Sequence, residues 1–212
     1  MHLPLIHAIA LDRDRYRTSR RHQFGGSAPA LPCAINQAVP FHAFTDETKE
    51  RRYVMVAAIL APSHLSTARS AMRSLILPRQ RRIHLHKESD ARRKQILDAV
   101  VAFGTRAIVY DGGRFGGRYK AARDACLARM VTDLVALGVE RFVLETEEGT
   151  LKSDRRLISG LLRDAGSQLP FYHLLAKEEC LLGVPDAIAW SWARGGHWRR
   201  RVEEIVDDVR RA

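Results

Sequence analysis

Two apolar segments close together in the sequence constrain the fold of this 212-residue chain more than any other feature. The strand-like run 41–45 leads into Asp46-Glu47, a turn-like stretch at 48–51 follows, and a second apolar run extends from Tyr53 to Leu60. Apolar runs joined by so few residues pair as an antiparallel hairpin. The hairpin would carry Asp46 and Glu47, either as functional carboxylates or as the acidic residues that commonly flank turns.

Beyond the hairpin, the apolar pattern alternates between helix and strand. Helical spacing predicts helices over 63–76, 90–103, 119–137, 154–164, 183–193 and 198–211, the last one charged and amphipathic. Short apolar runs predict strands over 105–110, 141–145 and 171–175, and an extended piece over 83–88. We expect the strands near 105–110 and 140–145 to join the hairpin through helical crossovers as parallel neighbours. The pattern as a whole predicts a mixed α/β sheet.

The composition bounds the domain organisation. Residues 1–40 combine five arginines with Gly25-Gly26-Ser27 and scattered prolines, which predicts a basic, disordered tail before a single domain over 41–212. A hydrophobic fraction of 46% suffices for a sizeable core. The cysteines at 33, 126 and 180 are far apart and odd in number, which argues against disulfides and favours a cytoplasmic protein. No apolar run approaches the roughly 20 residues that span a bilayer, so no membrane partner is expected.

The formal charge of +11 suggests a polyanionic partner such as nucleic acid. Only six of the 35 basic residues are lysines, so part of this excess could reflect a GC-rich genome. The distribution along the sequence is more informative. Between 69 and 94 there are nine basic residues and two acidic ones, whereas between 133 and 154 there are six acidic residues and two basic ones. The alternatives are a solvated helix face or a phosphate-binding surface, for which the candidates are Arg79, Arg81, Arg82, Lys87, Arg92 and Arg93.

Four short motifs resemble one known family. They are Asp-Glu at the end of the first strand, His-Leu-His-Lys-Glu at 84–88, acids directly after the strand 141–145, and Pro-Asp-Ala-Ile-Ala-Trp at 185–190. Together they resemble the bacterial domain-of-unknown-function 3800 family over about residues 41–195. The resemblance implies a ribonuclease H-like fold, with an antiparallel hairpin first and helices on both faces of the sheet. The chain departs from the family at Thr48-Lys49, where Ser-Gly is usual, and at Val184-Pro185, where the usual residues before the aspartate are Gln and Ala.

The chemistry of phosphodiester hydrolysis explains why these positions matter. Two divalent cations about 4 Å apart need carboxylates from separate elements to hold them beside the phosphate. Mg²⁺ or Mn²⁺ would be held here by Asp46, by Glu145 or Glu147, and by Asp186, with Glu47 as a further catalytic candidate. Asp186 could instead be an acid favoured by the helix dipole. Glu88 could join the same acidic centre.

The histidines offer a second kind of site. His84 and His86 would face one side of an extended segment, where His86 could relay protons or both could bind zinc if His42 converged on them. A metal-dependent nuclease acting on RNA or DNA is therefore the first hypothesis. The alternatives are a catalytically inactive module that binds nucleic acid or protein, and a small-molecule enzyme, for which no motif speaks.

Overall fold

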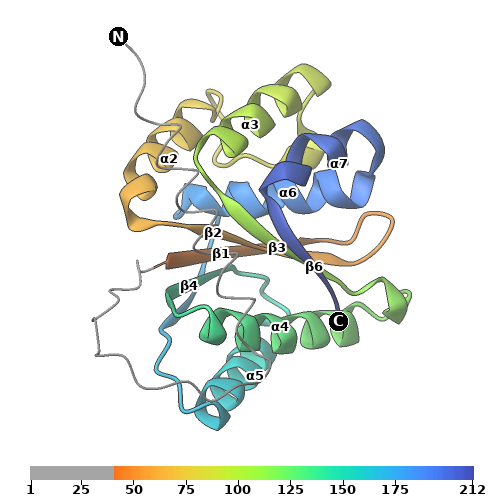
Figure 1. Cartoon of the computed structure of the whole chain (residues 1–212). Coiled ribbons are helices and arrows are strands. Elements are labelled where there is room, and N and C mark those ends of the chain that lie inside the picture. Colours follow the sequence, from red (N-terminus) through yellow and green to blue (C-terminus); the bar gives the residue numbers. More distant parts are fainter. Residues whose placement is uncertain (1–40) are drawn as a thin grey trace, which may run out of the picture. The chain divides into compact units, whose positions relative to one another are not determined.

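The computed structural model describes residues 41–212, in which six strands form one sheet in the order β5-β4-β1-β2-β3-β6 (Figure 1). The predicted tail at 1–40 lies outside the described residues. The strands are β1 Phe41–Thr48, β2 Val54–Leu60, β3 Arg106–Asp111, β4 Val139–Glu145, β5 Phe171–Leu174 and β6 Val206–Arg211.

The opening hairpin is confirmed. β1 pairs antiparallel with β2, with Asp46 opposite Val56, and the chain reverses through a turn in which Arg51 takes a left-handed φ of 60°. β4 joins β1 as the predicted parallel neighbour. The parallel placement predicted for β3 is wrong, because β3 pairs antiparallel with β2. The segment between the two strands returns the chain to the free edge of β2 in the direction opposite to that strand.

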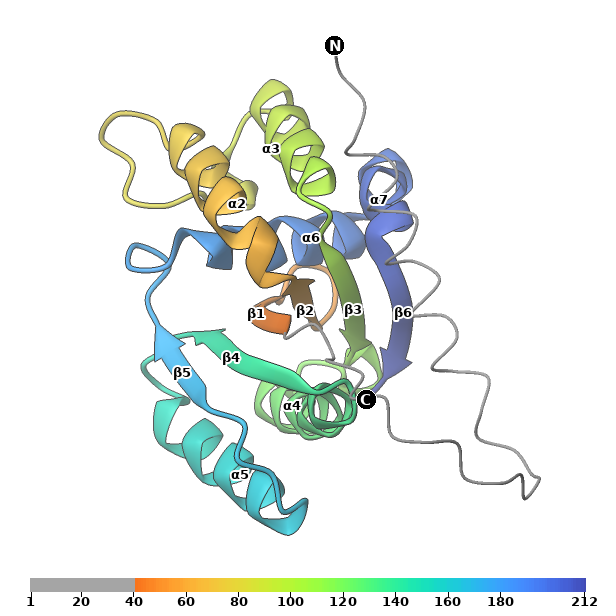
Figure 2. The same ribbon diagram turned by 60° about the vertical axis from the view of Figure 1, so that its left-hand side comes forward.

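Helices cover both faces of this sheet, as the resemblance to the ribonuclease H-like fold implies. The helices lie in two groups, one on each face of the sheet, in both ribbon views (Figures 1 and 2). The first pair is α4 Tyr119–Ala136 and α5 Leu151–Asp164, and the second group is α2 Pro62–Ser74, α3 Asp90–Ala102, α6 Gly183–Arg194 and α7 Gly196–Val202. None of the helices within 41–212 is long and apolar enough to cross a membrane.

The side-chain alternation of β2 explains the two cores. Val54, Val56, Ala58 and Leu60 point into the core under α2, α3 and α6, whereas Met55, Ala57 and Ile59 point into the core under α4 and α5. Every residue of β2 is buried, so this strand reads as a continuous apolar run rather than an alternating one.

Helix α6 is enclosed by the rest of the domain. All residues from Gly183 to Ala193 are buried, and the helix packs against β1, β2, α3 and α7. A Cβ atom at Gly183 would come within 2.9 Å of Met72 Cε, so glycine permits this close approach. Trp190 of this helix belongs to the core, with 4% exposure.

Two local predictions are wrong. Residues 198–211 form the end of α7, a 3₁₀ turn η4 at Glu203–Ile205 and the strand β6, because the β-branched Val206 and Val209 pair with the open edge of β3. The extended piece at 83–88 contains a 3₁₀ turn η1 at Leu85–Lys87. Two further 3₁₀ turns, η2 Gly113–Phe115 and η3 Cys180–Leu182, lie in loops.

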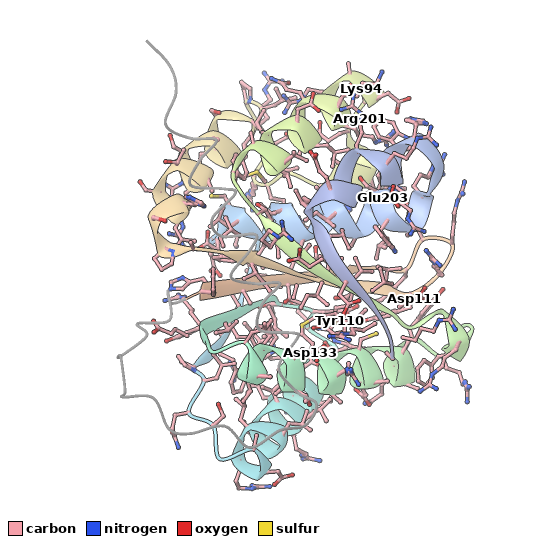
Figure 3. All side chains as sticks on the ribbon, viewed as in Figure 1. Lys94, Tyr110, Asp111, Asp133, Arg201 and Glu203 are labelled. Carbon is pink, nitrogen blue, oxygen red and sulfur yellow. The ribbon has the colours of Figure 1, made fainter. Side chains whose placement is uncertain are left out.

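The last strand is also tied to the opposite layer. Tyr110 Oη on β3 lies 3.2 Å from Asp133 Oδ2 on α4, and Arg210 Nε on β6 lies 3.4 Å from the same oxygen (Figure 3 labels Tyr110 and Asp133). A further ion pair joins Arg201 of α7 to Asp98 of α3 at 2.5 Å. The C-terminal segment is therefore part of the folded domain.

Candidate active site

A cavity of about 240 Å³ lies where β1, β4 and α6 meet. β1 and β4 run parallel, so Asp46 and Glu145 lie near the same end of neighbouring strands, and the first turn of α6 supplies Asp186. The cavity is lined by Asp46, Glu47, Lys49, Arg82, His84, Glu145, Thr146, Glu147 and Asp186. Each of the acidic residues predicted for the metal site therefore reaches one cavity.

Asp46 is the carboxylate with the least compensation. Its Oδ1 accepts a hydrogen bond from the backbone N–H of Glu47 at 2.7 Å. Burial raises the pKa of Asp46 well above its ordinary value, and the charges of Glu145, Asp186 and Glu47 and a hydrogen bond with Glu145 raise it further. Ionised Asp46 is thus surrounded by negative charge that a cation would relieve.

The other two carboxylates are held by protein donors. Glu145 forms an ion pair with Arg82, and the side chain of Glu145 is 16% exposed. Asp186 accepts from the backbone N–H of Leu85 at 2.7 Å and lies 3.1 Å from Nδ1 of His84. These contacts fix the orientation of both groups.

Glu47 and Glu147 belong to a neighbouring cluster centred on the buried Arg123 of α4. Arg123 Nη1 lies 2.6 Å from Glu47 and 3.5 Å from Glu147, and its other nitrogens bind Asp154. Burial raises the pKa of Glu47, and Arg123 opposes the rise. Burial would also raise the pKa of Glu147, but hydrogen bonds from Lys49 and Glu47 outweigh burial and lower it. The negative charges of Glu47 and Glu147 are therefore neutralised by basic side chains of the protein itself.

The donor set suits a hard divalent cation, because its members are carboxylate oxygens that repel one another. Asp46, Glu145 and Asp186 are the residues that could hold such an ion. No three acidic, histidine or cysteine side chains between residues 41 and 212 are placed as a ready-made set of metal ligands. The reason is visible in the contacts, since Glu145 is turned toward Arg82 and Asp186 toward His84 and Leu85.

The histidines lie differently from the prediction. The 3₁₀ turn η1 breaks the alternation, so that His86 is 59% exposed and pairs with Glu50, whereas His84 lines the cavity. His42 interacts with Arg141 and Arg69 rather than with the other two histidines. Glu88 does not join the acidic centre; it accepts from Gln80 at 3.1 Å and lies 3.6 Å from Arg92. The two imidazole rings still lie beside each other, with their centroids 6.1 Å apart.

The six basic candidates separate into three groups. Arg79, Arg81 and Lys87 are exposed and make no ion pair among the described residues. Arg92 and Arg93 are structural, since Arg92 bonds the carbonyl of Leu75 and Arg93 donates to two carbonyls of η1 and stacks on Trp190 at 4.6 Å. Arg82 enters the acidic cavity.

The basic partners of the cavity carboxylates were not predicted as such from the sequence. Lys49 lies 2.5 Å from Glu147 and is in the hairpin turn, where an exposed lysine is common and predicts no function. The contact of Arg82 with Glu145 joins residues 63 positions apart, and Arg82 is one of many arginines in its segment. Arg123 lies in an apolar helical pattern in which a single basic residue reads as solvent-facing.

The sequence matches no family model and no curated protein. Among solved structures, the chain resembles RNase HII in its PCNA complex from Archaeoglobus fulgidus, with 17% identity over 77% of this chain and 73% of that chain and a TM-score of 0.49. It also resembles Bst-RNase HIII in complex with Mn²⁺, with 15% identity over 84% of this chain and 61% of that chain and a TM-score of 0.46. At these identities the likeness concerns the arrangement of helices and strands.

Proposed function

We propose that this chain is a divalent-metal-dependent nuclease that hydrolyses phosphodiester bonds in RNA or DNA, with Mg²⁺ or Mn²⁺ as its cofactor. One observation carries the proposal. Asp46, Glu145 and Asp186 come from β1, β4 and α6 and line one cavity. The negative charges of Glu145 and Asp186 raise the pKa of the buried Asp46. Carboxylates gathered in this way cost stability unless a cation joins them, so a functional reason for the arrangement is favoured.

Each residue of the cavity would have a defined task. A bound divalent cation would neutralise charge on the phosphate and lower the pKa of the attacking water. Asp46 and Asp186 would hold the ion, and His84, through its contact with Asp186, would keep that carboxylate oriented. His84 would also be the nearest imidazole for proton transfer to the leaving oxygen.

The exposed arginines would bind the substrate backbone. Arg79 and Arg81 stand in the loop between α2 and η1, and the same loop leads directly to Arg82 and His84 in the cavity. Phosphates gripped by this loop would therefore continue toward the acidic centre. Such contacts give affinity without base specificity, which fits a nuclease or any general nucleic-acid binder.

The decisive experiment is a cleavage assay on single-stranded, double-stranded and hybrid RNA and DNA with Mg²⁺, with Mn²⁺ and with chelator. Asp46→Asn, which keeps the shape and removes the charge, should abolish hydrolysis. Glu148→Gln removes a nearby exposed acid and is the matched control, which should retain hydrolysis. The absence of metal-dependent cleavage of any of these substrates would overturn the proposal.

One set of contacts favours a second candidate, a catalytically inactive module that binds nucleic acid. Glu145 is paired with Arg82, and both oxygens of Asp186 have protein donors. A site that had lost its cation would keep its acids satisfied in this way. Salt-sensitive binding of nucleic acid together with no cleavage and no response to divalent ions would identify this candidate.

A further inference from the structure

The charges around the cavity can be counted from its contacts. Five carboxylates line it: Asp46, Glu47, Glu145, Glu147 and Asp186. Three of them have a basic partner: Arg82 pairs with Glu145, Lys49 lies 2.5 Å from Glu147, and Arg123, which also binds Asp154, lies 2.6 Å from Glu47. Within residues 41–212, Asp46 and Asp186 have no lysine or arginine partner. Asp46 is hydrogen-bonded to the backbone N–H of Glu47 and to Glu145, and Asp186 to the backbone N–H of Leu85 and to the imidazole of His84. Asp46 and Asp186 are therefore the two carboxylates of the cavity that remain for a divalent cation.

Arg82 is fixed beside this uncompensated pair. The next residue, Ile83, is 4% exposed and packs on Gly183 at the start of α6, and Leu85 donates its backbone N–H to Asp186. The backbone on the C-terminal side of Arg82 is therefore held against the helix that carries Asp186 by packing and by a hydrogen bond. The Arg82 side chain is 40% exposed, so its guanidinium contacts Glu145 and still presents N–H donors to the solvent.

We infer that the cavity takes a single divalent cation, held by Asp46 and Asp186, and that the guanidinium of Arg82 occupies the place that a second cation would take beside the scissile phosphate. The inference rests on the proposed function and specifies its metal content. A guanidinium supplies a permanent positive charge and paired donors that match phosphate oxygens, so it can neutralise the phosphate as the second ion would. Glu145, the carboxylate that a second ion would need, is already paired with Arg82.

The test counts Mn²⁺ ions on the full-length protein by titration, with the electron paramagnetic resonance signal of free Mn²⁺ as the readout. The natural protein should bind about one ion. Arg82→Gln frees Glu145 and should bind about two, whereas Arg82→Lys keeps the charge and should bind about one. Arg81→Gln changes an exposed neighbour in the same loop and is the control, also with about one ion.

The rate of hydrolysis gives an independent readout, because it should fall in the variant whose metal content rises. If Arg82 replaces a cation, Arg82→Gln should lose cleavage at least ten-fold even though it binds more metal, since the added ion lacks the geometry of the guanidinium. An Arg82 that merely blocks the cavity predicts that cleavage and metal content rise together. Faster cleavage in Arg82→Gln would therefore overturn the inference while leaving the proposed function in place.

A second variant covers the case in which Arg82→Gln does not fold. Glu145→Gln should still bind about one ion, because Asp46 and Asp186 remain. Two ions on the natural protein, or a fall from two to one in Glu145→Gln, would overturn the single-cation arrangement without touching the nuclease proposal. Binding of no Mn²⁺ by the natural protein would overturn both.

Discussion

Arg123 and Asp154 form a bidentate ion pair in which the side chain of Arg123 is 3% exposed and that of Asp154 is fully buried. Arg123 Nε lies 3.1 Å from both oxygens of Asp154, and Nη2 lies 2.8 Å from Oδ2. Thr150 Oγ1 donates to the same carboxylate at 3.0 Å. Because Arg123 also contacts Glu47, this pair connects the start of α5 with the end of β1 beside the cavity.

Asp154→Asn should therefore be strongly destabilising. It leaves the buried guanidinium without its bidentate partner, and breaking one side of a buried ion pair costs about 3 kcal/mol or more in the free energy of unfolding. Urea unfolding would measure this. The matched control is Asp164→Asn on the same helix, whose 75% exposed carboxylate should change the free energy by less than about 0.5 kcal/mol. Equal effects of the two variants would mean that the buried pair is not important for stability.

The same pair predicts how stability depends on pH. Burial would raise the pKa of Asp154, but the His173 ring 3.8 Å away, hydrogen bonds from Arg123 and Thr150 and the charge of Arg123 outweigh burial and lower the pKa to about 2. A carboxylate whose pKa is lower in the folded state stabilises the protein above its unfolded pKa near 4, and this contribution of about 2 kcal/mol disappears as pH falls toward 2. The difference in unfolding free energy between the natural protein and Asp154→Asn should shrink over that window. A difference that stays constant between about pH 6 and pH 2.5 would contradict the assignment.

Asp46→Asn should separate a functional carboxylate from a structural one. Removing one of several mutually repelling charges should leave the metal-free protein as stable as before or slightly more stable. Mg²⁺ or Mn²⁺ should raise the melting temperature of the natural protein, because the ion binds only the folded state, and should no longer do so in the variant. Thermal unfolding with and without the ion measures both effects, and Glu148→Gln should keep the response.

The opposite result for Asp46→Asn has a clear meaning. A loss of more than about 2 kcal/mol in the metal-free protein is the size expected for breaking a buried, hydrogen-bonded carboxylate. Asp46 would then serve the fold, and the inactive binding module would replace the nuclease proposal.

The exposed loop makes a prediction about salt. If Arg79 and Arg81 bind phosphates, the double variant Arg79→Ala/Arg81→Ala should flatten the dependence of nucleic-acid affinity on salt by about one unit of slope for each lost contact. Fluorescence anisotropy at several salt concentrations would measure the slope.

Two further arginines serve as controls for that measurement. Arg163→Ala removes an 80% exposed arginine on the other face of the sheet and should leave the slope unchanged. Arg93→Ala should instead lower the unfolding free energy by about 1–2 kcal/mol, since it removes the stacking on Trp190 and two hydrogen bonds. An unchanged slope in the double variant would leave genome composition as the explanation of the high arginine content.

The fold was predictable wherever local patterns and short connections decide the structure. The β1–β2 hairpin, α4, and α3 with Ser89 as its N-cap follow from apolar spacing, a short turn and a capping side chain. The segment 206–211 failed because its valines suit either an amphipathic helix or an edge strand, and the open edge of β3 decides between them. A sequence pattern contains no information about which edge is free.

The acidic residues of the site could be predicted from the sequence, but their basic partners could not. Asp46, Glu145 and Asp186 end strands or begin a helix, and the topology of an α/β sheet brings such positions together. The partners of those acids, Arg82 and Arg123, depend on contacts between residues far apart in the sequence. Long arginine side chains can reach many positions, so their partners follow only from three-dimensional coordinates.

The complete enclosure of α6 has a consequence for how the cavity can respond to a substrate. A helix whose residues are buried from Gly183 to Ala193 cannot shift without disturbing the core, so Asp186 keeps one position before and after binding. Amide protons of α6 should exchange with solvent only when the whole domain unfolds, whereas those of the exposed turn at 77–81 should exchange through local opening. Any adjustment to the shape of a nucleic acid must therefore come from the arginine-bearing turn, while the wall that carries Asp186 acts as a fixed template.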